Sequence, residues 1–591
     1  MEYPILNVKS NSRQMLDAFL GYNHNLRIGD SEFYDMKNMT SDYYPVLAPR
    51  TQRGIYRDGV KANGLIVKDK LCYVDGSKFV IGDYPIEMGL KDSTKELISM
   101  GAYVIIMPDK KWVNTQSWND DGTFNSEKGA GAIEEEHTIT SSNILLRLCS
   151  QTGDEYNVQW HGTPQEKDGN VIINDETMPP TVQKYSEAHK MWIKVSTTYV
   201  KIKAEGIGAN LSIYDGVKIS GFTGDVWKNL NGTHTLWGCS DDEIIIEGIP
   251  YADDQQDAED PVSATLTIKR EIPAMDFMVE SNNRLWGCRY GTNNNGDVVN
   301  EIYASKLGDF KNWNCFMGVS TDSYQVSCGT DGPFTGAITH LGYPLFFKEN
   351  CVHKVYGDYP ANFRLQNTTC RGVQKGSHKS LAIVNETLFY KSGNEVCAYD
   401  GSLPVEMSMA LGDVRYSDAV ACGHGNKYYI DMKATDGKYH LFVYDTAKGM
   451  WHKEDNLQVD AFCTDGSEVY AIDHHTGSII TLLGSGRKDA GKVPWMVETG
   501  PVGMTMPDMK YVSRLMIRMS LEVGANMTIR IRYDSMGDWE QVCRMTVTSL
   551  RSFSVPVRPR RCDHFRIRIE GEGEGRIYSI TKTIEQGSDI S

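Results

Sequence analysis

The chain contains 591 residues, more than a single hydrophobic core usually supports, so we expect two to four domains. It carries 77 Asp and Glu against 61 Lys and Arg, a formal net charge of -16 at pH 7. This acidic balance disfavours a protein that binds nucleic acid without sequence preference, because such binding needs an excess of Lys and Arg to neutralise phosphates.

The composition is typical of β structure. Tyr, Phe and Trp are abundant, with 31, 17 and 11 copies, and 55 Gly separate short apolar runs. No window approaches 18 apolar residues, and the start of the chain lacks a basic segment followed by an apolar one. We therefore expect an all-β protein with neither a signal peptide nor a membrane-spanning segment.

The thirteen Cys are scattered and odd in number, and no two form a C-x-x-C pair. This pattern predicts neither a zinc ribbon nor a redox motif. Most lie in apolar, strand-like contexts, where a free Cys behaves as a small buried hydrophobe. We expect the chain to fold in reducing cytosol.

The first 60 residues are expected to form an extended N-terminal arm. Residues 10–21 could make one short helix, capped by a Ser and ended by Gly21. Residues 35–50 contain two prolines and few alternating positions, a pattern typical of chain laid over another part of a structure.

A short phrase, an apolar and aromatic strand bounded by turns, recurs along the chain. It begins at Asn283, Tyr343, Glu386, Asn426 and Ser467, with gaps of 60, 43, 40 and 41 residues. Four-stranded propeller blades need roughly 40 to 50 residues each. The spacing predicts a β-propeller, and an antiparallel sandwich with accidental spacing is the alternative.

The rest of the chain is divided by the same criterion. The phrase also appears within residues 61–127, which we assign to the first blades, whereas 271–483 hold the remaining blades. It is absent from 128–270, which we interpret as an inserted β-domain, a small barrel or sandwich, because a loop of a rigid body tolerates long additions. Residues 484–591 begin with a linker and contain runs that alternate between apolar and polar positions, which predicts a β-sandwich of jelly-roll type. One such run has its apolar residues at Leu515, Ile517, Met519, Leu521 and Val523.

Three segments resemble a known protein family: Asn38-Met-Thr-Ser-Asp-Tyr-Tyr-Pro-Val-Leu-Ala-Pro-Arg50, Asn283-Arg-Leu-Trp-Gly287 and Ala304-Ser-Lys-Leu-Gly-Asp-Phe-Lys-Asn-Trp313. They are similar to phrases of tailed-bacteriophage virion proteins, the β-propeller nozzle, hub or stabilisation proteins of short-tailed phages. The similarity runs along most of the chain, but its motifs are short and structural. The positions it marks are Asn38, Tyr44, Pro45, Leu47, Arg50, Asn283, Arg284, Leu285, Trp286, Gly287 and Trp313.

The resemblance implies a structural part of a virion tail that is made in the host cytoplasm and catalyses no reaction. It implies a homo-oligomeric ring, a hexamer by analogy, that extends the channel through which the genome leaves. DNA would pass without specific binding, and an acidic surface would keep it from adhering, although solubility is the commoner explanation of an acidic balance. The arm would clasp a neighbouring subunit or the adaptor above, and fibre or tip proteins would be further partners.

One dense basic region lies near the end of the chain. Its members are Arg551, Arg558, Arg560, Arg561, Arg566 and Arg568. Arg suits bidentate contacts with carboxylate or phosphate, and no aromatic stripe accompanies these residues as single-strand binding would require. We interpret Arg558, Arg560 and Arg561 as a possible contact with an acidic partner, the alternative being solvated strand faces.

No motif predicts a metal, a cofactor or a catalytic residue. The acidic run 253–260 lacks the spacing of a calcium loop, and Glu134–His137 lacks the spacing of a zinc helix. His474 and His475 fall in a turn and are expected to be exposed. No sialidase box, nucleophile elbow or Walker loop is present.

Two other functions remain as alternatives. In a tail-tip adhesin, the inserted domain would bind a host-surface glycan, with Trp192, Trp227 and Trp237 stacking on sugars. In a propeller glycosidase, two carboxylates would face each other about 5 to 10 Å apart, and Asp276, Glu280 and Asp400 are the candidates.

Overall fold

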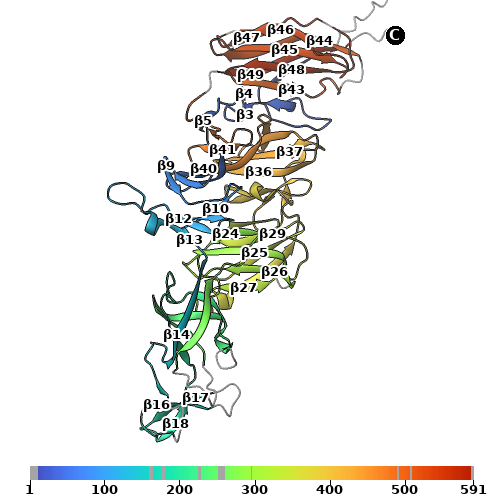
Figure 1. Cartoon of the computed structure of the whole chain (residues 1–591). Helices are drawn as coiled ribbons and strands as arrows, with labels where there is room; N and C mark the ends of the chain where they lie inside the picture. Colours follow the sequence, from blue (N-terminus) through green and yellow to red (C-terminus); the bar gives the residue numbers. More distant parts are fainter. Residues whose placement is uncertain are drawn as a thin grey trace, which may run out of the picture.

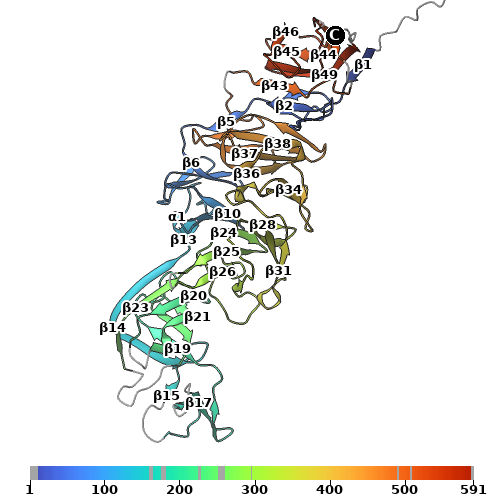
Figure 2. The ribbon, with the colours of Figure 1, turned by 90° about the vertical axis from the view of Figure 1, so that its right-hand side faces the viewer.

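The computed structural model describes residues 11–158, 164–174, 181–223, 228–249, 260–293, 296–488, 491–505, 509–546, 548–558 and 560–586. Strands make up 54% of the chain and helices 3%, which confirms the prediction of a nearly all-β protein. The elements form an elongated stack of bodies, red at one end, orange and yellow in the middle, and green to cyan at the other end (Figure 1, Figure 2). None of the helices in these ranges is long and apolar enough to cross a membrane.

Seven four-stranded antiparallel sheets in the described chain form the central body, which we call the sheet ring. In order they are β6 (Ala62–Val67), β7 (Leu71–Asp75), β8 (Lys78–Ile81) and β9 (Tyr84–Glu87); β10 (Glu96–Met100), β11 (Tyr103–Met107), β12 (Lys111–Asn114) and β13 (Ala130–Ala132); β24 (Phe277–Ser281), β25 (Arg284–Thr292), β26 (Val298–Ala304) and β27 (Tyr324–Ser327); β28 (Gly336–His340), β29 (Tyr343–Lys348), β30 (Cys351–Tyr356) and β31 (Arg364–Thr369); β32 (Ala382–Val384), β33 (Thr387–Lys391), β34 (Val396–Tyr399) and β35 (Val405–Glu406); β36 (Tyr416–His424), β37 (Lys427–Ala434), β38 (Tyr439–Asp445) and β39 (Met450–Lys453); β40 (Val459–Thr464), β41 (Val469–Asp473), β42 (Ile479–Thr481) and β5 (Gly54–Arg57).

The seven sheets close on themselves. The first strand of each sheet, or the turn before it, contacts its counterpart in the next sheet, and β40 of the last sheet contacts β6 of the first. The short helix η3 (His378–Ser380) makes this contact for the fifth sheet. The N-terminal strand β5 completes the seventh sheet by pairing with β42, so that strands from opposite ends of the sequence share one sheet.

The recurring phrase of the sequence supplies the second strand of each of these sheets. In β25, β29, β33, β37 and β41, consecutive residues are buried because both faces of the strand lie between neighbouring sheets. A separate apolar cluster fills each of the seven spaces between adjacent sheets. Each fully buried large apolar side chain contributes about 1.5 to 3 kcal/mol, which makes these clusters the main source of ring stability.

The insertion lies between β13 and β24, and it contains a closed barrel and a smaller sheet. The helix α1 (Ser126–Gly129) precedes β13, and η1 (Lys228–Leu230) lies within the insertion. The barrel strands, in order around it, are β14 (Glu135–Cys149), β19 (Tyr199–Lys203), β22 (Glu243–Glu247), β21 (Gly232–Ser240), β20 (Gly216–Ser220) and β23 (Val262–Arg270). The smaller sheet, which we call the distal sheet, contains β15 (Asn157–Val158), β16 (Asn170–Asn174), β17 (Thr181–Ser186) and β18 (Met191–Lys194).

The end domain consists of two sheets around one core. One sheet has the order β1 (Asn11–Leu16), β49 (Gly575–Gln586), β44 (Lys510–Leu521) and β47 (Arg551–Val555), and the other has the order β2 (Phe33–Lys37), β43 (Pro494–Thr499), β48 (Phe565–Glu572), β45 (Asn526–Tyr533) and β46 (Glu540–Met545). The expected alternation holds for Leu515, Ile517 and Met519, which are buried. Val523 was expected to continue that row but is 86% exposed, because β44 ends at Leu521.

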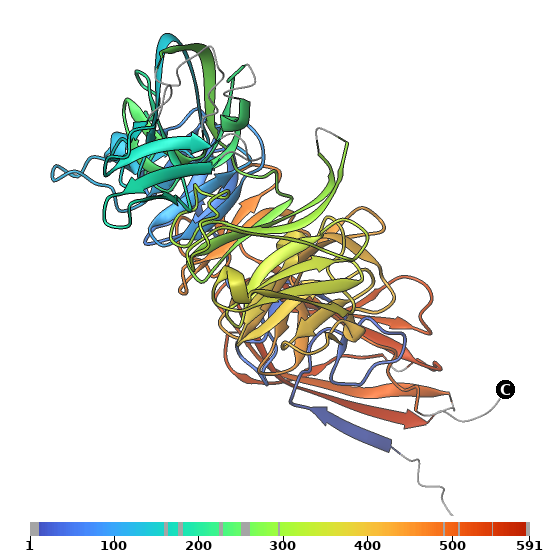
Figure 3. The ribbon, with the colours of Figure 1, turned by 90° about the horizontal axis from the view of Figure 1, so that it is seen from below.

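The first 60 residues differ from the expected arm. The helix expected over residues 10–21 is instead strand β1, which pairs with β49 in the end domain (Figure 3). Met15, Leu16, Phe19 and Leu20 do have helical spacing, but the free edge of β49 offers backbone partners that outweigh this weak local preference. In the structure the described part of this interval is divided: β1 and β2 belong to the end domain, β5 belongs to the sheet ring, and the hairpin of β3 (Met39–Thr40) and β4 (Ala48–Pro49) lies between them.

Candidate functional site

The phrase that begins at Asn38 forms the joint between the sheet ring and the end domain. The Asn38 backbone N–H donates to the Glu454 carbonyl oxygen over 2.6 Å, and its side-chain Nδ2 donates to the Pro494 carbonyl oxygen over 2.7 Å. Its Oδ1 accepts from Arg50 Nε over 2.9 Å. Asn38 has a φ of 55°, a left-handed conformation that Asn tolerates better than most residues. One buried amide therefore connects the sixth ring sheet, the start of β43 and the hairpin.

Four charged side chains reinforce this joint, which we call the ring–end joint. Arg53 contacts Glu454 at 2.7 Å and Asp455 at 2.8 Å, and Arg50 contacts the same two carboxylates at 3.2 and 3.1 Å. Burial alone would raise the pKa of Asp455, but the guanidinium groups of Arg53 and Arg50 outweigh it and hold this pKa below its ordinary value. Two arginines share two carboxylates, so each charge has more than one partner.

Of the other residues of the phrase, some are buried in the protein and others are exposed to solvent. Leu47 is buried and exchanges backbone hydrogen bonds of 3.0 and 2.9 Å with Ile577 of β49. Ser41 Oγ donates to Asp445 Oδ2 over 2.5 Å. Tyr44 and Pro45 form an exposed turn, with Tyr44 41% exposed. The turn is the part of the phrase that another molecule can reach.

The second phrase fixes a long loop of the third ring sheet. Asn283 lies in the turn before β25, and Leu285 and Trp286 are buried. Arg284 is 1% exposed and donates to the carbonyl oxygens of Ser305 and Ser320, both over 2.8 Å. Gly287 packs so closely against Met275 that a side chain at position 287 would overlap the Met275 sulfur.

The third segment fixes the barrel to the ring, at what we call the ring–barrel joint. Asp215, before β20, forms an ion pair of 2.6 Å with Arg270 at the end of β23, and both side chains are about 5% exposed. Asn312 Nδ2 donates to Asp215 Oδ1 over 2.7 Å, and Asn312 Oδ1 accepts from Gly216 N over 3.0 Å. Trp313 is buried beside it and donates to the Phe310 carbonyl oxygen over 2.9 Å.

The resemblance thus marked residues at both joints but missed their partners. Arg53, Glu454, Asp455, Asp215 and Arg270 complete the two polar clusters and were not singled out from the sequence. Each looks like an ordinary loop or strand-end charge. Only the pairing of distant segments reveals its role.

In the basic region, some arginines form ion pairs with a buried carboxylate and others are exposed to solvent. Arg566 and Arg568 contact the buried Glu498 at 3.2 and 2.6 Å. Arg560 pairs with Glu540 at 2.7 Å while remaining 60% exposed. Arg558 and Arg561 are exposed and form no ion pair with any described residue. The three arginines expected to contact a partner, Arg558, Arg560 and Arg561, are thus all exposed.

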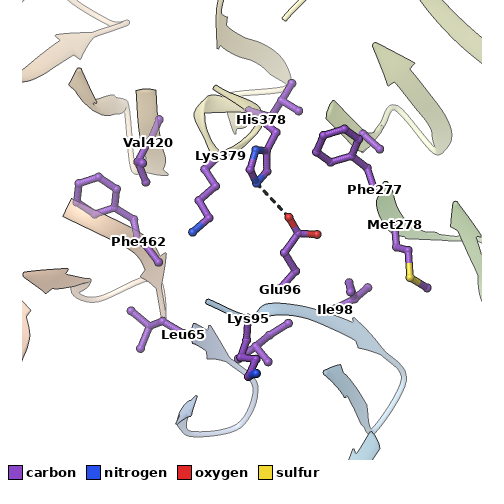
Figure 4. A pocket seen from close by; sticks show the side chains of 15 residues that line it. Leu65, Lys95, Glu96, Ile98, Phe277, Met278, His378, Lys379, Val420 and Phe462 are labelled. Carbon is purple, nitrogen blue, oxygen red and sulfur yellow. Dashed lines mark ion pairs between the residues drawn. The ribbon is translucent and has the colours of Figure 1, made fainter. Parts of the chain in front are cut away.

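A cavity of about 290 Å³ lies at the centre of the sheet ring, and all seven sheets contribute to its wall (Figure 4). Its polar lining residues are Lys95, Glu96, His378 and Lys379. Among the described residues of this lining, Glu96 is the only carboxylate, whereas glycosidases of the expected type use two. The cavity as lined does not offer that pair.

The three carboxylates proposed for a glycosidase lie elsewhere and have local partners. Asp276 pairs with Arg289 at 2.7 Å, Glu280 accepts from Asn283 N over 2.9 Å, and Asp400 accepts from Ser402 N over 3.0 Å. They are not brought together into one acidic site.

Several of the residues considered for metal binding or for stacking on sugars have local partners in the structure. Glu134 pairs with Lys110 at 2.6 Å, and within the described ranges no group of His, Cys, Asp and Glu is arranged to hold a metal ion. Residues 253–257 and Glu259 lie outside the described residues, as does Trp227. Trp192 packs edge-on against Tyr185 and Trp237 against Tyr199, with ring centres 5.3 and 5.5 Å apart. His474 is exposed and pairs with Asp460.

No family model and no curated protein matches the sequence. Among solved structures, the chain is similar to the exo-β-1,3-galactanase of Phanerochaete chrysosporium with galactose, at 9% identity over 52% of this chain and 94% of that chain, with a TM-score of 0.21. It is similar to the WD40 repeats of RRP9, at 7% identity over 59% of this chain and 99% of that chain, with a TM-score of 0.23. It is also similar to Trypanosoma rangeli sialidase, at 9% identity over 89% of this chain and 95% of that chain, with a TM-score of 0.18. Likenesses of this strength carry no argument about the activity of this chain.

Proposed function

We propose that this chain is a structural subunit of a bacteriophage tail and that copies of it form a nozzle or hub ring extending the DNA channel. In this proposal the sheet ring is a seven-bladed β-propeller that β5 closes, and the end domain is a β-sandwich of jelly-roll type. The protein would be made in the host cytoplasm and then built into the virion tail. It would act by shape and charge.

The observation that carries the proposal is the position of the phage-like phrases. Asn38 and Arg50 lie in the ring–end joint, and Asn312 and Trp313 lie in the ring–barrel joint. Buried polar clusters fix the relative position of the bodies they connect, because separating them would leave charged groups desolvated and unpaired. A part that transmits position along a tail requires such fixed joints.

The size of the central cavity constrains where DNA could pass. A cavity of about 290 Å³ has the size of a small-molecule site and is far too small for a DNA duplex. In the proposed assembly the channel therefore runs between subunits. A ring of six remains our expectation from the resemblance.

The distribution of charge is compatible with this arrangement. Residues 491–591 carry 15 Lys and Arg against 12 Asp and Glu, whereas the rest of the chain carries 46 against 65. The acidic remainder would repel DNA at short range, and the exposed Arg558, Arg560 and Arg561 would contact an acidic tail protein such as the adaptor.

The test is native mass spectrometry of the purified protein together with electron microscopy of phage particles. We expect a closed oligomer, and we expect density for the chain in the tail of every particle. A protein that stays monomeric at all concentrations and is absent from particles would end the proposal.

The exposed Tyr44 turn gives a sharper test of the contact between neighbouring subunits. Deleting residues 35–50 would destroy the ring–end joint, so the test is the single change Tyr44→Ser, which leaves that joint intact. We expect folded protein with reduced incorporation into tails. Tyr359→Ser, at a ring position that is 44% exposed, is the matched control.

One observation favours the adhesin alternative. The strand β18 of the distal sheet, at the end of the molecule opposite the end domain, exposes Met191 by 55% and Ile193 by 42% (Figure 1). In an adhesin these side chains would border the binding surface. Full-length protein with both residues changed to Ser would then lose cell binding while still joining particles.

A further inference from the structure

The cavity at the centre of the sheet ring combines an apolar wall with a few charged groups. Side chains from the first strands of the sheets, including Leu65, Phe277, Met278 and Phe462, form the apolar part. Small-molecule sites have this character, with mostly apolar walls and a few polar groups that orient the ligand. Its volume of about 290 Å³ is just below the usual range of roughly 300–1,000 Å³ for such sites.

We propose that this cavity binds a small hydroxycarboxylate, whose carboxylate contacts the ammonium group of Lys379 and whose hydroxyl donates to Glu96. The proposal does not depend on the tail function, because none of these residues belongs to either joint or to the exposed turn. It assigns a ligand class to the one place where all seven sheets meet.

Lys379 provides the anchor for the carboxylate. Its side chain extends into the cavity between His378 and Phe462 (Figure 4), and Nζ donates to the Asp460 carbonyl oxygen over 2.9 Å. An ammonium group has three donors, and among the described residues this one forms no ion pair. Burial lowers the pKa of Lys379, and Glu96 and Asp460 oppose that shift only in part. A bound carboxylate would supply the missing charge and acceptors.

Glu96 and His378 form a second polar pair beside Lys379 (Figure 4). Glu96 Oε1 and His378 Nε2 lie 3.0 Å apart, and the two side chains are 38% and 31% exposed, so solvent reaches part of each although Nε2 itself is buried. The alignment of the pair falls outside hydrogen-bond geometry, which leaves His378 Nε2 without a hydrogen-bond partner among the described residues. Glu96 therefore retains acceptor capacity for a ligand hydroxyl.

The charge balance favours a single carboxylate over a more highly charged ligand. Lys95 also lines the cavity, but its ammonium contacts Asp109 at 2.5 Å and has no exposed surface. Lys379 is thus the one lining lysine without a counter-ion in the described chain. Glu96 would repel a second negative charge placed next to it.

The test is isothermal titration calorimetry of the full-length protein with glycolate, L-lactate and D-glucuronate. We expect saturable binding of at least one of them, with no binding of D-glucose, which has hydroxyls but no carboxylate. Lys379→Met should weaken binding about 10- to 100-fold, the usual effect of losing a charge-assisted hydrogen bond. Lys375→Met, which changes an exposed lysine of the same loop, should leave it unchanged.

Glu96→Gln gives a second variant in case Lys379→Met does not fold, which circular dichroism would report. It keeps the shape of the side chain and should weaken hydroxycarboxylate binding while leaving any binding of acetate unaltered. The proposal is overturned if none of the three acids binds, or if Lys379→Met and Lys375→Met bind them equally. Either result leaves the proposed tail function untouched, because that function is measured by incorporation into particles.

Discussion

The two joints of this molecule fix their neighbours in different ways. At the ring–end joint, two arginines share two carboxylates, Asn38 adds three hydrogen bonds, and one apolar cluster runs without interruption from the sixth ring sheet into the end domain. At the ring–barrel joint, one buried ion pair and one asparagine carry the polar contacts, and the barrel has an apolar core of its own. The first joint is redundant and the second depends on a single charge pair, so the two should respond differently to single substitutions.

The largest effect is expected at the ring–barrel joint. Asp215→Ala leaves the buried Arg270 without a counter-ion and removes an acceptor from Asn312, which should lower the free energy of unfolding by about 3–5 kcal/mol. Denaturant unfolding measures this loss, and limited proteolysis between the ring and the barrel should accelerate. Lys269→Ala, which breaks only half-exposed pairs on the same strand, should change stability by less than about 1 kcal/mol. Equal effects of the two changes would contradict the importance of the buried pair.

A smaller effect is expected from the corresponding change at the ring–end joint. Arg53→Met removes one guanidinium group, but Arg50 still contacts both Glu454 and Asp455, so the loss should be about 1–3 kcal/mol. The same denaturant experiment measures it, with Arg487→Met at an exposed pair as the control. A loss as large as that of Asp215→Ala would show that the second arginine provides no redundancy.

Asp431 sharpens the comparison through pH. This buried carboxyl of β37 has a pKa raised to about 7, mainly by burial and against hydrogen bonds from backbone N–H groups. A folded-state pKa above the ordinary value near 4 means that ionisation of Asp431 destabilises the fold, so the contribution of this group to stability should fall as pH rises from about 4 to 7. Asp431→Asn should remove this loss and raise the free energy of unfolding by about 1–3 kcal/mol at pH 8, with little change at pH 4.

Unfolding curves of both proteins at pH 4 and pH 8 measure the Asp431 effect. A parallel pH dependence in the two proteins would exclude Asp431 as its source. The Asp215→Ala variant, whose change lies at the ring–barrel joint and away from Asp431, should keep the wild-type pH dependence between pH 4 and pH 8.

The smallest effect on stability is expected at the free end of the end domain. Arg560→Ala breaks an exposed pair with Glu540 and should change the free energy of unfolding by less than about 1 kcal/mol. If the basic region contacts an acidic partner, the same change together with Arg558→Ala and Arg561→Ala should weaken incorporation into tails. Normal incorporation would assign these arginines to the solvent-exposed surface alone.

The sequence predicted the repeated sheets well, because their second strands are buried on both faces and therefore appear as compact apolar phrases. All five phrases from Asn283 onward became second strands of ring sheets. The seventh sheet could not be predicted in the same way. Its outer strand, β5, lies more than 400 residues before its partner β42, and neither segment contains a local signal for the other.

The joints were predictable only in part. The resemblance marked Asn38, Arg50 and Trp313, but charged residues such as Arg53 and Asp215 look solvated when only their neighbours in sequence are considered. Their partners lie about 400 and 55 residues away, so their burial follows from the folded arrangement and not from local pattern. The central cavity was missed for the same reason, since each sheet contributes only one to four residues to it.

The participation of β1, β2 and β5 in sheets built from the last quarter of the chain affects how the protein is made. A ribosome that adds about 5–20 residues per second needs roughly half a minute to two minutes to finish 591 residues. For most of that time these three segments wait outside the ribosome without their partners, with edges able to pair with other nascent chains. A message truncated near its 3′ end should therefore yield a protein whose N-terminal segments are exposed as well.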